Sequence, residues 1–278
     1  MNELTLTLKK ELKIPIDGSI ISPTSLNGKT IEEIKNLELW RGNRKVKMDK
    51  VFHVKGKSEG EEDNLTVRLV GDFSKARGLG FKMKGGTLVI DGNAGLRLGE
   101  KMSGGLIKVN GNAGSWLGSE MSGGTIEVEG NAGDFVGAGY RGGRKGMKGG
   151  KIMIKGSCGA EAGAWMINGV IKVYGNSGIF PGIHMKGGTI FVKGGCEGRA
   201  GAEMKDGKIV ILGYLPSILP SFDIEEVKAS VKVEEEKISG PFYLFTGDIN
   251  EEGVGKLYVS INSNPQLKFW EKFLESVI

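Results

Sequence analysis

The sequence predicts a mainly β protein: a right-handed parallel β-helix of about eight coils, with a small α/β segment before it and a strand and helix segment after it. Two observations carry this prediction. A short phrase recurs at an almost constant spacing, and within each copy apolar residues alternate with polar ones. A fixed period near twenty residues is typical of stacked repeats, and a period of two among β-branched residues is typical of a half-buried strand.

The repeat is marked by methionine. Seven methionines follow one another at steps of 19, 19, 26, 19, 19 and 19 residues: Met83, Met102, Met121, Met147, Met166, Met185 and Met204. The motif G-x-x-M-x-x-G-x-[IL]-x-[VI]-x-G covers residues 80–92, 99–111, 118–130, 163–175, 182–194 and 201–213, and the copy at 144–156 begins with Arg144. A flexible thioether fills an irregular corner well, so we expect the methionines to form one inward ladder.

A strand follows each methionine. In the third copy, Ile126 and Val128 flank Glu127, so one face of the strand should be buried and the other wet. Stacked copies would place equivalent residues about 4.8 Å apart, which is the spacing of paired strands. A degenerate copy with Val67 and Leu69 precedes the first methionine, so the repeat region is expected to span 65–213.

A second inward column should consist of small residues. It contains Ala94, Ala113, Ala132, Cys158, Ser177 and Cys196. Cys158 and Cys196 are then two coils apart, about 10 Å, whereas a disulfide needs Cα atoms within about 7 Å. We therefore predict two buried free thiols and disfavour a redox pair or a metal site.

The flanking segments differ from the repeats. Residues 1–64 are expected to form an α/β cap, in which Thr30 and Glu33 make a capping box before a short helix and residues 45–55 alternate as a strand. Residues 214–278 should hold the strands SVKV, FYLF and KLYVSI. A terminal helix should follow, with Asn264 as N-cap and Pro265 in its first turn. The expected apolar face of that helix is Leu267, Trp270, Phe273 and Leu274.

Composition excludes several classes of protein. The formal net charge of +5 permits an acidic partner, but there is no zinc-finger spacing and no interleaving of aromatic and basic residues for single-stranded nucleic acid. No apolar run approaches the ~18 residues of a membrane span. The first residues carry no signal-peptide pattern. We expect a cytoplasmic protein that binds neither nucleic acid nor membrane.

No motif indicates chemistry in this chain. Residues 137–142 match G-x-G-x-x-G, but they lie inside a repeat and no helical pattern follows, so the match is interpreted as accidental. The two histidines, His53 and His184, and two buried cysteines cannot supply a zinc or iron–sulfur site. We therefore predict no catalytic, cofactor-binding or metal-binding residues.

One irregularity and a set of aromatic residues indicate a surface for a partner. The 26-residue step places seven extra residues near 139–145, which would bulge from the shaft as a basic loop; a tolerated insertion explains it equally well. Outward aromatic side chains at equivalent turns also suggest an interface, and Trp116 and Phe135 should be direct neighbours. On the strand face, the patch with Tyr174 and Phe191 could be covered by the tail helix. The residues expected at a partner interface are Trp116, Phe135, Phe180, Tyr140, Arg141 and Arg144.

These repeats, together with the closing SGPFYLFTGDINEEGVGKLYVSIN, make the chain resemble the C subunit of formylmethanofuran dehydrogenase over essentially its whole length. The repeat region alone is similar to the C-terminal β-helix of the glutamate synthase large subunit. The resemblance implies an archaeal oxidoreductase complex of one-carbon metabolism that joins carbon dioxide to methanofuran with electrons from reduced ferredoxin, the first step of methanogenesis.

In that family the tungsten- or molybdenum-pterin, the iron–sulfur clusters and zinc-type metals are expected in formate-dehydrogenase-like and amidohydrolase-like partner subunits. The resemblance thus implies a non-catalytic scaffold subunit. The alternatives are the equivalent C subunit of a bacterial formyltransferase/hydrolase complex and a stand-alone glutamate-synthase-type domain. A stand-alone acyltransferase or polysaccharide lyase is disfavoured, because 19 is not a multiple of the acyltransferases' six-residue period and no cluster of carboxylates marks one face.

Overall fold

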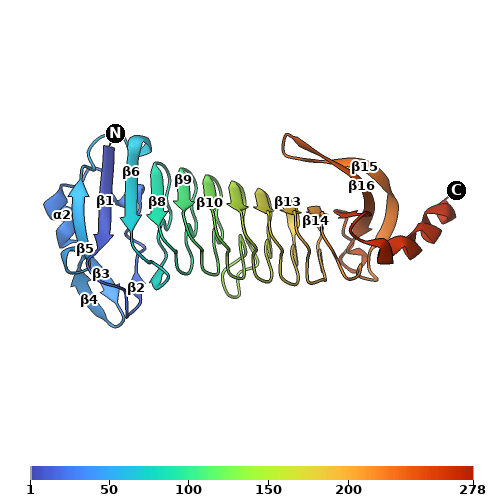
Figure 1. Ribbon diagram of the computed structural model, residues 1–278, viewed down its shortest axis with the longest axis horizontal. Coiled ribbons are helices and arrows are strands. Elements are labelled where there is room, and N and C mark those ends of the chain that lie inside the picture. Colours follow the sequence, from blue (N-terminus) through green and yellow to red (C-terminus); the bar gives the residue numbers. More distant parts are fainter. Residues whose placement is uncertain (1, 278) are drawn as a thin grey trace.

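The computed structural model describes residues 2–277, so Met1 and Ile278, the outer ends of the two expected flanking segments, lie outside the described residues. The repeats lie side by side along the long axis of an elongated molecule (Figure 1). The fold is mainly β. Its larger sheet has thirteen strands in the order β15-β16-β17-β14-β13-β12-β11-β10-β9-β8-β6-β1-β5.

Each repeat contributes one strand to the middle of this sheet. The strands are β8 (Thr87–Asp91), β9 (Leu106–Val109), β10 (Thr125–Val128), β11 (Lys151–Ile154), β12 (Val170–Val173), β13 (Lys186–Val192) and β14 (Asp206–Ile211). They pair in parallel, and Ile126 lies beside Ile107 on one side and Ile152 on the other. The predicted register is therefore confirmed, and it continues unbroken across the 26-residue step.

The methionines lie inside this stack, and all seven are fully buried. Their methyl groups fill the space beside glycines of the next repeat: a Cβ on Gly124 would stand 2.6 Å from Cε of Met102. Gly124 also has φ +79, which a side chain would strain. The same relation links Met83 to Gly105 and, near the other end, Met185 to Gly207. The methionine side chain therefore fits only where the next repeat has a glycine, because a Cβ at that position would clash with its methyl group.

The small residues form a second column beside the first. Parallel bridges join Ala94, Ala113 and Ala132, and further bridges join Cys158, Ser177 and Cys196. Both cysteines are buried and free. Burial raises the pKa of each thiol to about 11.

The sheet continues into the N-terminal segment. The degenerate copy forms β6 (Leu65–Val70), which pairs in parallel with β8 as predicted. β1 (Asn2–Leu8) adds a further parallel strand, and β5 (Phe52–Gly56) ends the sheet in antiparallel pairing. The hydrogen-bonded ladder thus crosses the expected boundary near residue 64.

The N-terminal helix forms where the capping box predicts it. α2 (Ile31–Asn36) begins after Thr30, whose hydroxyl accepts from the backbone N–H of Glu33 while the Glu33 carboxylate accepts from the backbone N–H of Thr30. A shorter helix, α1 (Pro23–Leu26), and a 3-10 turn, η2 (Glu62–Asn64), lie in the same segment.

One N-terminal prediction is wrong. The alternating run 45–55 is not one strand but β4 (Arg44–Lys47), a 3-10 turn η1 (Met48–Lys50) and β5. The chain turns here because Met48 is fully buried and its backbone N–H bonds to Leu37. β4 belongs to a second, four-stranded sheet with β3 (Glu38–Arg41), β2 (Ile16–Asp17) and β7 (Ala76–Arg77).

The three predicted strand segments of the tail are confirmed. They lie in β15 (Asp223–Val233), β16 (Glu236–Gly247) and β17 (Gly255–Ser260), and a 3-10 turn, η3 (Ile249–Glu251), precedes the last. β17 pairs in parallel with β14 and so extends the sheet of the repeats. β15 and β16 form a long hairpin that arches back toward the repeat strands (Figure 1).

This hairpin, not the tail helix, covers the apolar patch on the strand face. Phe191 and Val210 of the sheet are buried with Val231, Val233 and Phe242 of the hairpin. Ion pairs hold the tip of the hairpin against the sheet. The ammonium of Lys172, a residue only 6% exposed, lies 2.7 Å from the carboxylate of Glu234 and 3.7 Å from that of Glu236. Lys151 lies 2.8 Å from Glu234. The sequence did not show that the hairpin covers this patch, because the contact joins residues that are far apart in the chain.

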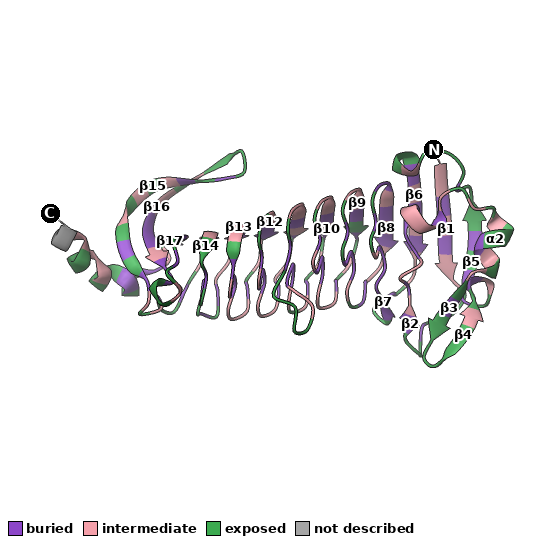
Figure 2. Cartoon of the chain, turned by 180° about the vertical axis from the view of Figure 1, so that it is seen from behind, coloured by how far each residue is buried: buried purple, intermediate pink, exposed green. Residues whose placement is uncertain are grey.

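The terminal helix differs from its prediction in type and in packing. η4 (Pro265–Val277) is a 3-10 helix. Asn264 is fully buried and ties the tail to the last repeat: its side chain accepts from the backbone N–H of Leu215 at 2.8 Å and donates to the carbonyl of Gly213 at 3.0 Å. Leu267 is buried, but Phe273 is 45% exposed, so the predicted apolar face is wrong there. Figure 2 shows the mixed exposure of this element.

Candidate interaction surface

Two columns of strained turn residues run along the repeats, opposite the strands. The first column contains Arg97, Trp116, Phe135, Glu161, Phe180 and Arg199; the second contains Lys82, Lys101, Glu120, Trp165, His184 and Glu203. All twelve have φ between +52 and +63, and among the described residues only two other non-glycine residues have positive φ. Left-handed backbone costs a side chain of order 1 kcal/mol or more, which glycine would avoid. Aromatic and charged residues occupy most of these positions despite that cost.

The predicted contact between Trp116 and Phe135 is confirmed. Their rings stack with centroids 4.7 Å apart and planes at 14°. Both are half-buried, because Leu117 and Val136, the next residues, are fully buried and hold the turns against the interior. Phe180 lies apart from this stack, because Glu161 occupies the intervening position of the same column.

The extra residues 139–145 fold back over the aromatic side chains. The loop projects from the shaft as predicted, with residues 141–145 exposed, but Tyr140 at its base is half-buried against Trp116 in an edge contact of 5.6 Å. The guanidinium of Arg97 lies 4.5 Å from the Tyr140 ring and that of Arg141 lies 5.5 Å from the Trp116 ring. A turn closed by the Gly143 N–H and the Tyr140 carbonyl, 2.7 Å apart, then brings Arg144 to 5.9 Å from the ring of Trp165.

The second column holds a stacked pair that the sequence reasoning missed. Trp165 and His184 have ring centroids 4.0 Å apart at 18°, and Nδ1 of His184 is 3.2 Å from a carboxylate oxygen of Glu203. The ammonium of Lys186 lies 5.6 Å from the Trp165 ring. Both aromatic residues directly precede a repeat methionine, so the same period that predicted the first stack would have predicted this one.

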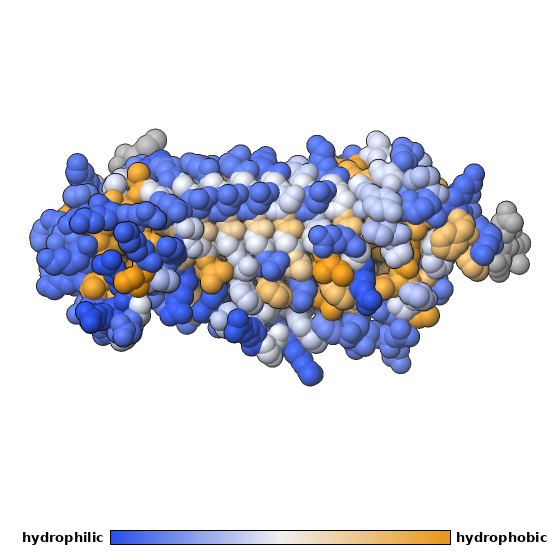
Figure 3. All heavy atoms as spheres, turned by 60° about the horizontal axis from the view of Figure 1, so that its bottom comes forward, coloured by the Kyte–Doolittle hydropathy of each residue, from blue (hydrophilic) through white to orange (hydrophobic). Residues whose placement is uncertain are grey.

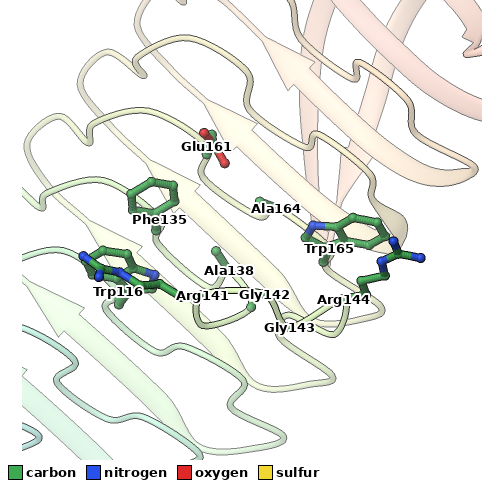
Figure 4. Close-up of a pocket in the computed structure, with 11 residues that line it drawn as sticks. Trp116, Phe135, Ala138, Arg141, Gly142, Gly143, Arg144, Glu161, Ala164 and Trp165 are labelled. Atoms are coloured by element: carbon green, nitrogen blue, oxygen red, sulfur yellow. The ribbon is translucent and has the colours of Figure 1, made fainter.

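A groove lies between the two columns. It has a volume of ≈ 580 Å³ and is lined by Trp116, Phe135, Trp165, Arg141, Arg144 and Glu161, with Ala138 and Ala164 between them. Arg141 and Arg144 stand at opposite ends (Figure 4). A second hollow of ≈ 480 Å³ shares Arg144 and Trp165 and continues to Glu203. With this side turned forward, apolar side chains form a band along the molecule between hydrophilic ones (Figure 3).

The groove has three charged side chains, Arg141, Arg144 and Glu161, and Glu161 makes no ion pair with a described residue. Arg141 and Arg144 are exposed, and neither makes an ion pair with any residue that the structure describes. The groove therefore offers aromatic faces together with two cations that remain available.

The described residues, 2–277, contain no group of three or more His, Cys, Asp and Glu side chains that could hold a metal ion. Within the same range, no helix has both the length and the apolar character required to cross a membrane.

Comparison with known proteins gives consistent results. No family model matches the chain. It is 56% identical to the C subunit of tungsten-containing formylmethanofuran dehydrogenase 2 from Methanococcus maripaludis, over 96% of this chain and the whole of that protein. It is 39% identical, over 34% of this chain and 32% of the relative, to the C subunit of molybdenum-containing formylmethanofuran dehydrogenase 1 from Methanosarcina barkeri.

Among solved structures, a chain of the formyltransferase/hydrolase complex from Methylorubrum extorquens, crystallised with methylofuran, superposes with a TM-score of 0.81 at 27% identity, over 92% of this chain and 99% of that one. Both the sequence match and the superposition cover the repeats and most of the two flanking segments, at 96% and 92% of this chain. The chain therefore belongs to the family formed by the C subunits of formylmethanofuran dehydrogenases.

Proposed function

We propose that this chain is a scaffold subunit of a tungsten- or molybdenum-dependent formylmethanofuran dehydrogenase complex and supplies no catalytic group itself. The observation that carries the proposal is the 56% identity to a C subunit of such a complex over 96% of the chain. The reaction of the complex would be the reductive joining of carbon dioxide and methanofuran with electrons from ferredoxin, in the cytoplasm.

The architecture supports a scaffold. In our proposal the repeats 65–213 form a right-handed parallel β-helix, with residues 1–64 and 214–278 as the units that close its ends. The thirteen-stranded ladder joins β1 and β5 of the N-terminal flank and β15, β16 and β17 of the tail to the repeat strands in one hydrogen-bonded sheet. Such a body holds two partners at a fixed separation, because bending it would break many parallel hydrogen bonds together.

Cofactors would reside in partner subunits, which we propose to be formate-dehydrogenase-like and amidohydrolase-like. The thiols of this chain do not fit a metal cluster. Ser177 separates the two cysteines in their column, and burial raises the pKa of each thiol to about 11, whereas metal ligands must be thiolates.

The test is assembly. A tagged chain expressed in a methanogen should retain partner subunits that hold tungsten or molybdenum, while the isolated polypeptide should hold neither metal nor activity. The double variant Trp116→Ser with Phe135→Ser should retain clearly less partner, because the stacked pair is lost. Trp40→Ser, which alters an indole that is 49% exposed at the N-terminal end, is the matched control. Formylmethanofuran turnover by the isolated chain would refute the scaffold role, and equal retention by both variants would rule out the surface around Trp116 and Phe135 as the interface.

The bacterial formyltransferase/hydrolase complex is a second candidate because of the TM-score of 0.81. The lower identity, 27% against 56%, makes it the weaker one. Partners that contain neither tungsten nor molybdenum would favour it.

A further inference from the structure

We propose that the groove between Trp116 and Trp165 binds an acidic segment of a partner subunit, with one carboxylate at each end and an apolar or planar side chain between them. This inference rests on the proposed function and names the chemistry of the partner. It also gives the extra residues 139–145 a role, because they supply both cations.

The two arginines are prepared for carboxylates. Arg141 lies over the ring of Trp116 and Arg144 over that of Trp165, at 5.5 and 5.9 Å from the ring centres. A guanidinium stacked on a ring keeps its N–H edge free for a bidentate carboxylate. Neither has a carboxylate partner among the described residues.

Three other arginines pair with carboxylates of the chain, whereas Arg41, Arg44 and Arg199 make no ion pair with a described residue. Arg68 binds Asp91 at 2.8 Å, Arg77 binds Asp17 at 3.2 Å and Arg97 binds Glu100 at 2.5 Å. The chain therefore pairs arginines with its own carboxylates at several turns, but supplies none to the two that flank the groove. What sets Arg141 and Arg144 apart is that both line one groove and lie over its ring faces, where a partner's carboxylates can reach them.

The middle of the groove disfavours a negative charge. Ala138 and Ala164 lie between the arginines and leave room for a peptide backbone, while Phe135 offers a ring face (Figure 4). Glu161 stands on the same lining and repels a carboxylate placed at the centre. Acidic groups are thus favoured at the ends and an uncharged side chain between them.

A nucleic acid would also bring anions and planar rings, but it fits less well. Its phosphates are evenly spaced, and one placed between the two arginines would meet Glu161. The adjoining hollow adds Lys186 and Lys205 as well as Glu203 and Glu251, so it offers no continuous row of cations. A peptide can place its charges unevenly, as this groove requires.

The first experiment identifies the occupant in the assembled complex. Benzoylphenylalanine replaces Lys145, which is exposed at the end of the extra segment, and the tagged complex is irradiated and digested for mass spectrometry. We expect an adduct on a partner peptide with closely spaced Asp or Glu residues. An adduct on a peptide without them, on nucleic acid, or no adduct in an intact complex would overturn the inference.

The second experiment reverses the charges. Arg141→Glu with Arg144→Glu should lower partner retention at low salt by about ten-fold or more, and the Arg→Lys pair should lose less. Lys10→Glu with Lys57→Glu makes the same change of charge at exposed residues of the N-terminal segment and should have no effect. Circular dichroism should be unchanged in all variants, because these side chains are exposed.

The outcomes separate this inference from the proposed function. Normal retention of the tungsten or molybdenum partners by the charge-reversed chain refutes the acidic segment and leaves the scaffold role standing. Failure of the unaltered chain to retain any such partner refutes the scaffold role itself.

Discussion

Replacement of Met121 by alanine tests the interlocked interior most directly. Met121 is fully buried, and its methyl group lies against Gly150 of the next repeat, where a Cβ would be only 2.8 Å away. The substitution removes the γ-methylene, the sulfur and the methyl group. Strands on both sides are fixed by parallel pairing, so the backbone cannot close the gap.

The magnitude follows from large-to-small changes in protein cores, which cost about 2–5 kcal/mol. Met102 and Met147 adjoin the gap in the same column, and their flexible side chains can fill part of it. We therefore expect the free energy of unfolding to fall by about 3 kcal/mol.

Denaturant titration of the purified chain, followed by circular dichroism, measures this loss. Met153→Ala is the matched control, since Met153 lies in β11 at an outward, half-buried position and should cost about 1 kcal/mol or less. Equal losses for the two variants would refute the claim that the methionine column stabilises the stack.

The remaining predictions concern the hairpin and the thiols. Burial by itself raises the pKa of Glu234, but hydrogen bonds from Lys151 and Lys172 outweigh it and hold that pKa below its ordinary value of 4.5. The stabilisation from a carboxyl group with a lowered pKa is fully present above its ordinary pKa and is lost as the pH falls through the lowered one. Hydrogen-exchange protection of β15 should therefore decrease as the pH falls below that ordinary value. Glu234→Gln should weaken that protection at pH 7 and remove its change with acid; an unchanged acid response would exclude the ion pairs as its cause. Because burial raises the pKa of Cys158 and Cys196 to about 11, both should resist alkylation at pH 8 and react fully after denaturation, as read by mass spectrometry. Formation of a disulfide between them in the folded chain would contradict the register.

Local and periodic features were predictable from the sequence. The step of 19 residues fixes which side chains are neighbours, so the pairing of Ile107 with Ile126 and the stack of Trp116 on Phe135 follow from counting alone. The capping box at Thr30 is equally local, because its partners are three residues apart. The partner role of the groove, and the bounds of the three expected units, stay predictions.

Contacts outside the period were not predictable. The extra residues 139–145 carry no repeat, so nothing in the sequence showed that Arg141 and Arg144 would return to ring faces of the two turn columns. Nor did it show that the β15–β16 hairpin would cover Phe191, or that Asn264 would bind the backbone near Leu215.

The sequence by itself determined the repeat, its register and its buried columns, because a constant period in the chain becomes a constant displacement in space. Only the tertiary structure decided how the insertion and the tail pack on that stack. Their positions depend on side chains that meet across long stretches of sequence, where shape and charge, not spacing, select the contact.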